Sequence, residues 1–117
     1  MSNNMSTISA YSVINEVIPK INAVEKLVEG TLKEIVETSR LPTEIERYSK
    51  LQMEFKLELS MIRMNLEHLL NRYHKEITAV KQNENNNMLL TLDPHEATAI
   101  ESASALYRRV QELQQAK

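Results

Sequence analysis

Cysteine is absent from the chain, which excludes disulfide bonds, thiolate catalysis and zinc sites built on cysteine. The single glycine cannot supply a glycine-rich phosphate-binding loop. With one glycine and three prolines, the sequence holds few residues that favour turns. Few turns in 117 residues favour a small number of long helices over a many-stranded sheet.

Charge of one sign and long apolar runs are also missing. The formal net charge of −2 gives no basic footprint, so we expect no nucleic-acid partner. No apolar run approaches the roughly 18 residues of a membrane helix, and no helix has a strongly basic polar face, so we expect no membrane association. The N-terminus lacks the basic and apolar regions of a Sec signal peptide. A cytoplasmic location is therefore expected, with export by another route left open.

The spacing of the apolar residues predicts an all-α chain. Residues 1–7 are polar and are expected to be flexible, whereas residues 8–117 are expected to form one helical domain. Apolar steps of three and four residues predict helices over about 8–40 and 43–81. Because the connection between them is short, we expect these helices to fold back as a long antiparallel hairpin.

The turn of the hairpin is predicted from local signals. Pro42 should end the first helix, because the residue before a proline is biased away from helical geometry. Thr43 and Glu46 have the spacing of a capping box, which predicts that the second helix begins at Thr43.

A third helix is predicted near the C-terminus, after a loop at 82–92. Asp93 is a suitable N-cap, Pro94 suits the first helical position, and Glu96 completes a capping box. These signals predict a shorter helix over about 94–115. The whole chain is then either a three-helix bundle or part of an oligomeric bundle.

The stretch LQMEFKLELSM, residues 51–61, alternates apolar and polar positions as a half-buried strand would. Its leucines, methionines, glutamates and lysines are good helix formers, and heptad spacing continues on both sides of it. We therefore predict a helix here. One of its stripes is the expected intramolecular or coiled-coil seam, with the members Tyr48, Phe55, Leu59, Ile62, Leu66, Leu69 and Tyr73.

A second apolar stripe lies on the opposite face, about 200° around the helix. Its members are the candidate partner-binding residues Met53, Leu57, Met61 and Met64. A helix with two opposed apolar stripes needs two partners, and the first helix can cover only one of them. The third helix of a closed bundle, a second copy of the chain or a helix of another protein could cover the other. Methionine suits adaptable binding surfaces because it is flexible and polarizable.

The segment RMNLEHLLNRYH, residues 63–74, is the polar stretch that most suggests chemistry. Arg63 and His68 have the R-x4-H spacing, and in this the segment resembles HEPN-type ribonucleases, where paired Arg and His act on the RNA backbone across a dimer. The resemblance implies an RNase, or an inactive relative, that uses Arg63 and His68. Met64 departs from the pattern, and the two side chains point about 140° apart on a regular helix. The alternative is a solvated helix face with i, i+4 ion pairs, namely Arg63–Glu67 and Arg72–Glu76.

Metal and cofactor sites are not expected. The only histidines are His68, His74 and His95, and none has a glutamate three residues before it, so the di-iron pattern of helical bundles is absent. Glu67 and His74 share a face, but two groups do not make a metal site. We likewise expect no small-molecule ligand.

These observations together predict a non-catalytic protein that works by association. In general shape, the expected hairpin looks like the small helical-hairpin structural proteins and chaperones of bacterial secretion systems, and like small phage accessory proteins. The resemblance implies a structural, adaptor or chaperone component of such an assembly. The expected partner is a second copy of the chain or a helical protein.

Overall fold

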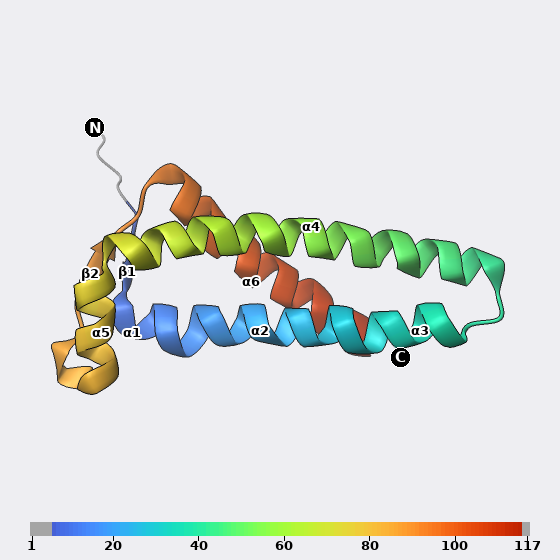
Figure 1. Cartoon of the computed structure of the whole chain (residues 1–117), viewed down its shortest axis with the longest axis horizontal. Coiled ribbons are helices and arrows are strands. Elements are labelled where there is room, and N and C mark those ends of the chain that lie inside the picture. The colour runs from blue at the N-terminus through green and yellow to red at the C-terminus, as the bar shows by residue number, and fades with distance from the viewer. Residues whose placement is uncertain (1–5, 116–117) are drawn as a thin grey trace.

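The computed structural model describes residues 6–115 and confirms the predicted all-α class. Two long helical arms run antiparallel in a molecule whose longest dimension is 52 Å (Figure 1). The second arm is α4 (Pro42–Arg72). The first arm, residues 10–38, is a continuous helix in which α-helical and π-helical (η) segments alternate: α1 (Ala10–Ser12), η1 (Val13–Val17), α2 (Ile18–Lys26), η2 (Leu27–Leu32) and α3 (Lys33–Thr38).

Pro19 does not end the first arm. Proline has no backbone N–H, and its ring clashes with the carbonyl four residues before it in a regular α-helix. Immediately before Pro19, the N–H of Ile18 donates to the carbonyl of Val13, five residues back. This π-helical register at η1 widens the turn around the proline, so the helix continues through it.

The turn between the arms differs from the predicted capping box at Thr43 and Glu46. α4 begins at Pro42, and the preceding Leu41 is extended (φ −99°, ψ 113°) with no side-chain cap. Pro42 suits the first helical position, because the N–H it lacks would have no partner there. Ser39 closes the turn instead: its Oγ donates to Glu44 Oε1 (2.7 Å).

The predicted single helix over 43–81 bends at Tyr73, which has φ −114° and ψ 33°. α4 ends at this bend and α5 (His74–Gln82) turns toward the first arm (Figure 1). The Tyr73 hydroxyl accepts from the N–H of Thr91 (3.1 Å) and donates to the Thr91 carbonyl (3.3 Å). The bend is therefore held by a contact with a strand residue 18 positions further along the chain, which helix propensity does not encode.

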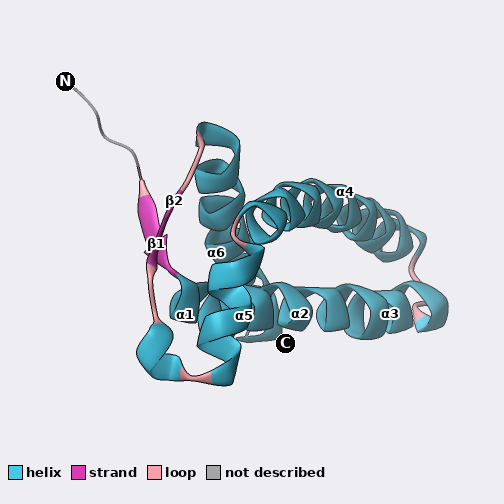
Figure 2. Cartoon of the chain, turned by 60° about the vertical axis from the view of Figure 1, so that its left-hand side comes forward, coloured by secondary structure: helices cyan, strands magenta, loops and turns pink. Residues whose placement is uncertain are grey.

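A short two-stranded sheet replaces part of the predicted flexible N-terminus and of the predicted loop at 82–92. β1 (Thr7–Ser9) pairs antiparallel with β2 (Leu89–Thr91), so that Ile8 lies opposite Leu90 (Figure 2). A 3-10 turn, η3 (Glu84–Asn86), precedes β2. The rest of the predicted flexible segment, residues 1–5, lies outside the described residues.

The core lies between the two arms and the last helix, α6 (Pro94–Gln115). α6 crosses the hairpin on one side and packs against α4 and α2 (Figure 1). From α4 the core takes one stripe of side chains that are at most 5% exposed: Phe55, Leu59, Ile62, Leu66 and Leu69. Tyr48 and Tyr73, at the two ends of this stripe, are half-buried and pack against the core. α4 thus has one fully covered face along its middle.

Candidate interaction surface

The opposite face of α4 carries a row of exposed apolar side chains, which we call the outer stripe: Met53, Leu57, Met61 and Met64. Each is 62–64% exposed, whereas Phe55, between the first two in sequence, is fully buried. Steps of three and four residues place all four on one side of the helix. A contiguous apolar row of this kind on a monomer marks an interaction surface more often than an isolated exposed leucine does.

α6 does not cover the outer stripe. It lies on a different side of α4, where the Arg109 guanidinium sits 4.8 Å from the centre of the Phe55 ring. The first arm occupies a third side, where Gln52 donates to the carbonyl of Val28 (3.2 Å) and Arg63 pairs with Glu25. Residues 6–115 therefore leave open the one side of α4 that holds the outer stripe.

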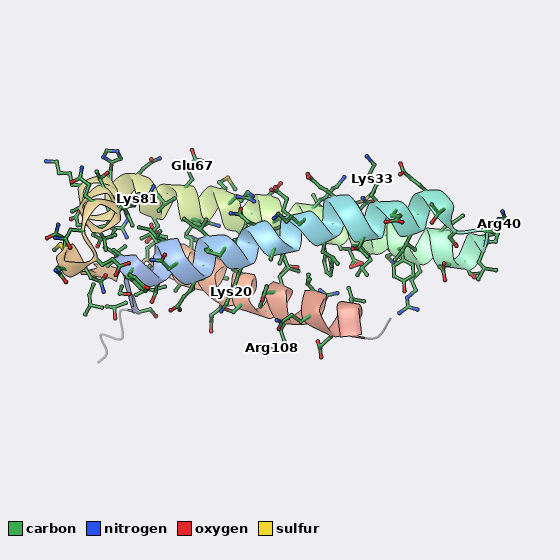
Figure 3. The ribbon with its side chains drawn as sticks, turned by 90° about the horizontal axis from the view of Figure 1, so that it is seen from below. Lys20, Lys33, Arg40, Glu67, Lys81 and Arg108 are labelled. Atoms are coloured by element: carbon green, nitrogen blue, oxygen red, sulfur yellow. The ribbon has the colours of Figure 1, made fainter. Side chains whose placement is uncertain are left out.

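Charges of both signs flank the outer stripe along α4. Lys50 and Glu67 are exposed beyond its two ends, and Lys56 is exposed beside it. In the view from below the hairpin, Glu67 points away from both the first arm and α6 (Figure 3). This mixture gives no strong field of one sign and suits a protein partner with matched charges.

A groove of about 570 Å³ lies beside this surface, where the end of α6 crosses α4. Its walls carry charged side chains of both signs in nearly equal number, the basic Arg47, Lys50 and Arg109 and the acidic Glu54 and Glu112. The groove therefore offers no concentrated charge for an anionic or cationic ligand.

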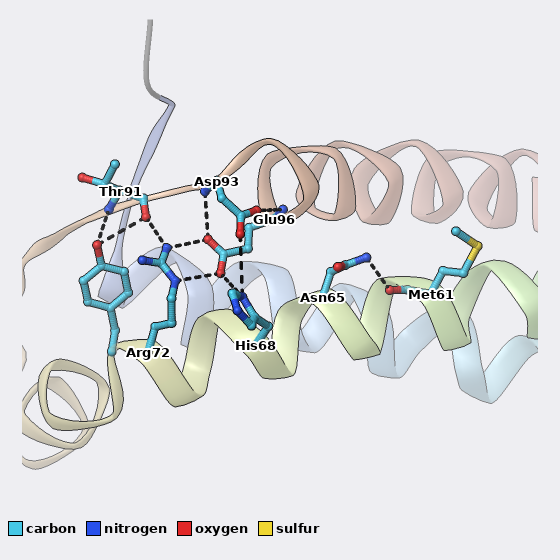
Figure 4. Close-up of polar contacts among 8 residues, drawn as sticks. Met61, Asn65, His68, Arg72, Thr91, Asp93 and Glu96 are labelled. Atoms are coloured by element: carbon cyan, nitrogen blue, oxygen red, sulfur yellow. Dashed lines mark hydrogen bonds and ion pairs between the residues drawn. The ribbon is translucent and has the colours of Figure 1, made fainter. Parts of the chain in front are cut away.

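A polar cluster joins the other end of α4 to the start of α6. Glu96 is 1% exposed, and Arg72 holds both of its carboxylate oxygens, from Nη2 at 2.6 Å and from Nε at 3.0 Å (Figure 4). His68 Nδ1 lies 2.7 Å from the same carboxylate. The predicted capping box of α6 is present: Asp93 N–H donates to Glu96, and Glu96 N–H donates to Asp93. We call Arg72, Glu96, His68 and Asp93 the α4–α6 clamp.

The electrostatics of the clamp favour an ionised Glu96. Burial alone raises the pKa of this carboxyl. Hydrogen bonds from Arg72, from the Asp93 backbone and from His68 outweigh it and lower the pKa from 4.5 to about 2. The hydrogen bond with Glu96 in turn raises the pKa of Arg72.

The free energy of unfolding is expected to fall as the pH is lowered from about 4.5 to about 2. The folded pKa of Glu96 lies below its unfolded value, so its contribution is complete above 4.5 and is lost as the folded carboxylate is protonated near 2. One proton gives a slope of at most about 1.4 kcal/mol per pH unit. Urea unfolding across this range should show a shallower dependence for Glu96→Gln. Equal slopes for the two proteins would contradict the assignment.

The clamp does not have the donor set of a free metal site. One ligand atom each of His68, Asp93 and Glu96 lies within 4.8 Å of the others. Both oxygens of Glu96 are already held by Arg72, and one of them also accepts from the Asp93 N–H. A cation would have to displace the guanidinium of Arg72 from its bidentate pair with Glu96. The geometry therefore supports a structural role, in which the cluster holds α6 against α4.

The structure does not bring Arg63 and His68 together. Arg63 Nη2 lies 3.2 Å from Glu25 and 3.3 Å from Asn22, on the side of the first arm. His68 instead contacts Glu96 at the start of α6. The predicted i, i+4 pairs Arg63–Glu67 and Arg72–Glu76 are also wrong, because each arginine pairs with another helix. Sequence reasoning missed the Arg72–Glu96 pair, although the Asp93–Glu96 capping box already placed Glu96 at a helix start.

Comparisons with known proteins give no further information about function. The chain matches no protein-family model, and neither the curated proteins nor the solved structures include one significantly similar to it. Within residues 6–115, no helix combines the length and the apolar character needed to cross a membrane.

Proposed function

We propose that this protein is a non-catalytic assembly or adaptor component that binds helices, either its own or a partner's, through the outer stripe of α4. The observation that carries the proposal is the contrast between the two faces of α4: the inner face is at most 5% exposed, whereas the outer stripe is 62–64% exposed. Burying one such side chain is worth about 1.5–3 kcal/mol, so a partner that covers the row gains substantial free energy.

The scaffold supports this role. α4 is an uninterrupted helix of 31 residues, packed on two sides by the first arm and by α6. Its outer stripe is therefore presented on a rigid element, while its methionine side chains can adapt to the surface they meet. A rigid helix with adaptable apolar side chains is typical of surfaces that bind a helix in a groove or pair with another helix.

The double variant Leu57→Glu/Met61→Glu is expected to abolish association, because it places two carboxylates in the middle of the outer stripe. Light scattering on a sizing column should give a mass above that of the monomer for the wild type as concentration rises, and a monomer for the variant. Both side chains are exposed, so the variant should keep the helical circular dichroism of the wild type.

Leu41→Glu is the matched control. Leu41 is 60% exposed, as exposed as the stripe residues, but lies in the turn between the arms. It should associate like the wild type. An oligomer that persists in Leu57→Glu/Met61→Glu would place the contact elsewhere and contradict the proposal.

A further inference from the structure

The outer stripe belongs to a longer pattern along the open face of α4. Eight residues recur at alternating steps of four and three, which is the heptad spacing of a coiled-coil seam. All eight are exposed. We call this row the outer seam: Glu46, Lys50, Met53, Leu57, Ser60, Met64, Glu67 and Asn71.

The order of residue types in the outer seam is nearly symmetric about its centre. Three apolar residues and one small polar residue occupy the middle: Met53, Leu57, Ser60 and Met64. Charged residues of opposite sign flank them, Lys50 on one side and Glu67 on the other, and Glu46 and Asn71 lie outermost. In an antiparallel helix pair, the seam positions of one helix face those of the other in reverse order. Lys50 then meets Glu67 of the second copy, Met53 meets Met64 of the second copy, and the twofold axis repeats both contacts.

A parallel pair in the same register has the opposite electrostatics. Lys50 would face Lys50 of the second copy, and Glu67 would face Glu67 of the second copy. Like charges in direct contact at an interface disfavour that arrangement, whereas opposite charges favour theirs. The charge order therefore favours the antiparallel arrangement.

The rest of the fold leaves room for this approach. The first arm and α6 lie on other sides of α4, and α5 turns toward the first arm rather than toward the outer seam (Figures 1 and 2). Glu67 points into open space (Figure 3). At about 1.5 Å per residue, α4 is roughly 46 Å long, which accommodates the whole seam on one uninterrupted helix.

We propose that the outer seam pairs with the same seam of a second copy of this chain, antiparallel and about a twofold axis near Leu59, with Lys50–Glu67 ion pairs on both sides of the central residues. This inference rests on the proposed function, and it identifies the partner of the outer stripe as a second copy of this chain. Met61, which is 62% exposed at the edge of the seam, adds an apolar side chain beside the central Leu57 and Ser60. The dimer places the inner face of each α4 toward its own core and the outer face toward the other copy.

Engineered cysteines test the orientation without interference, because the chain has none of its own. Met53→Cys and Met64→Cys are made in separate full-length chains, one of which carries a size tag. Each chain is oxidised by itself, and a mixture of the two chains is oxidised in parallel. The antiparallel pair should give a disulfide-linked dimer of the two different chains in the mixture only. Within each separate chain, the two copies of its cysteine lie about 16 Å apart along the axis, too far for a disulfide. Disulfide dimers of each separate chain would overturn the antiparallel orientation.

Charge exchange tests the ion pairs. Lys50→Glu and Glu67→Lys should each raise the dimer dissociation constant about tenfold or more, measured by sedimentation equilibrium. The double exchange Lys50→Glu/Glu67→Lys should restore dimerisation, because it reverses both pairs together. Arg108→Glu, on the exposed side of α6, is the control and should leave the constant unchanged. Failure of the double exchange to restore dimerisation would overturn the predicted contact.

The outcomes separate this inference from the proposed function. Suppose that Leu57→Glu/Met61→Glu dissociates the dimer, but that two Met53→Cys chains form a disulfide with each other. The outer stripe is then still the interface, and the antiparallel register is overturned. A wild-type monomer at every concentration overturns pairing with a second copy and leaves a foreign helix as the occupant. A dimer that survives Leu57→Glu/Met61→Glu overturns both.

Discussion

Replacing Phe55 with alanine is expected to lower the free energy of unfolding by about 3–5 kcal/mol. Phe55 is fully buried, and its ring lies under the guanidinium of Arg109 from α6. Truncation removes the buried ring and leaves a cavity where α4 meets α6, in a well-packed part of the core. Urea or guanidinium unfolding, followed by circular dichroism, measures the loss as a lower midpoint with little change in slope.

Met53→Ala is the matched control, two residues away on the same helix. Met53 is 64% exposed, so the change should alter stability by less than about 0.5 kcal/mol when measured at a concentration where the chain is monomeric. At higher concentration, Met53→Ala should weaken association instead. Equal losses of stability for the two variants would contradict the orientation of α4.

Replacing Arg72 with methionine is expected to lower the free energy of unfolding by about 3 kcal/mol, because removing one partner leaves an uncompensated buried charge. Glu96 is 1% exposed, and only His68 and the Asp93 N–H would remain as its donors. The pKa of Glu96 should rise when Arg72 is lost, so the variant should lose less stability than the wild type between pH 4.5 and 2. Denaturant unfolding at pH 7 and pH 3 measures both effects.

Arg63→Met is the control for this prediction. Arg63 lies on the same helix and forms an ion pair with Glu25. Both side chains are largely accessible to solvent, that of Arg63 to 40% and that of Glu25 to 43%. Exposed pairs of this kind contribute less than about 1 kcal/mol, so the control should lose little stability. If the two variants lose equal stability, the clamp does not hold α6 against α4 in the way that the geometry indicates.

The helical class and the capping of α6 could be predicted because they depend on neighbours in sequence. The alternating stretch at 51–61 is helical in the structure, as its helix-forming residues indicate. The Asp93–Glu96 capping box depends on residues three apart, and both of its hydrogen bonds are present.

The bend at Tyr73 and the short sheet could not be predicted, because both depend on contacts between distant segments. Tyr73 is held by the backbone of Thr91, and β1 pairs with a strand about eighty residues away. The predicted capping box at Thr43 was wrong for a local reason: Pro42 was itself suited to the first helical position.

The two opposed apolar stripes of α4 could be predicted from the residue order alone, because helical periodicity is a local property of the chain. Which of the two stripes is covered depends on how the helices pack in three dimensions. The α4–α6 clamp fixes where α6 begins, and α6 crosses α4 over the side of Phe55. The first arm covers a neighbouring side, so the stripe from Met53 to Met64 is exposed on the remaining one. Which side is covered depends on the path of helices joined by long-range contacts, and no local pattern encodes that path.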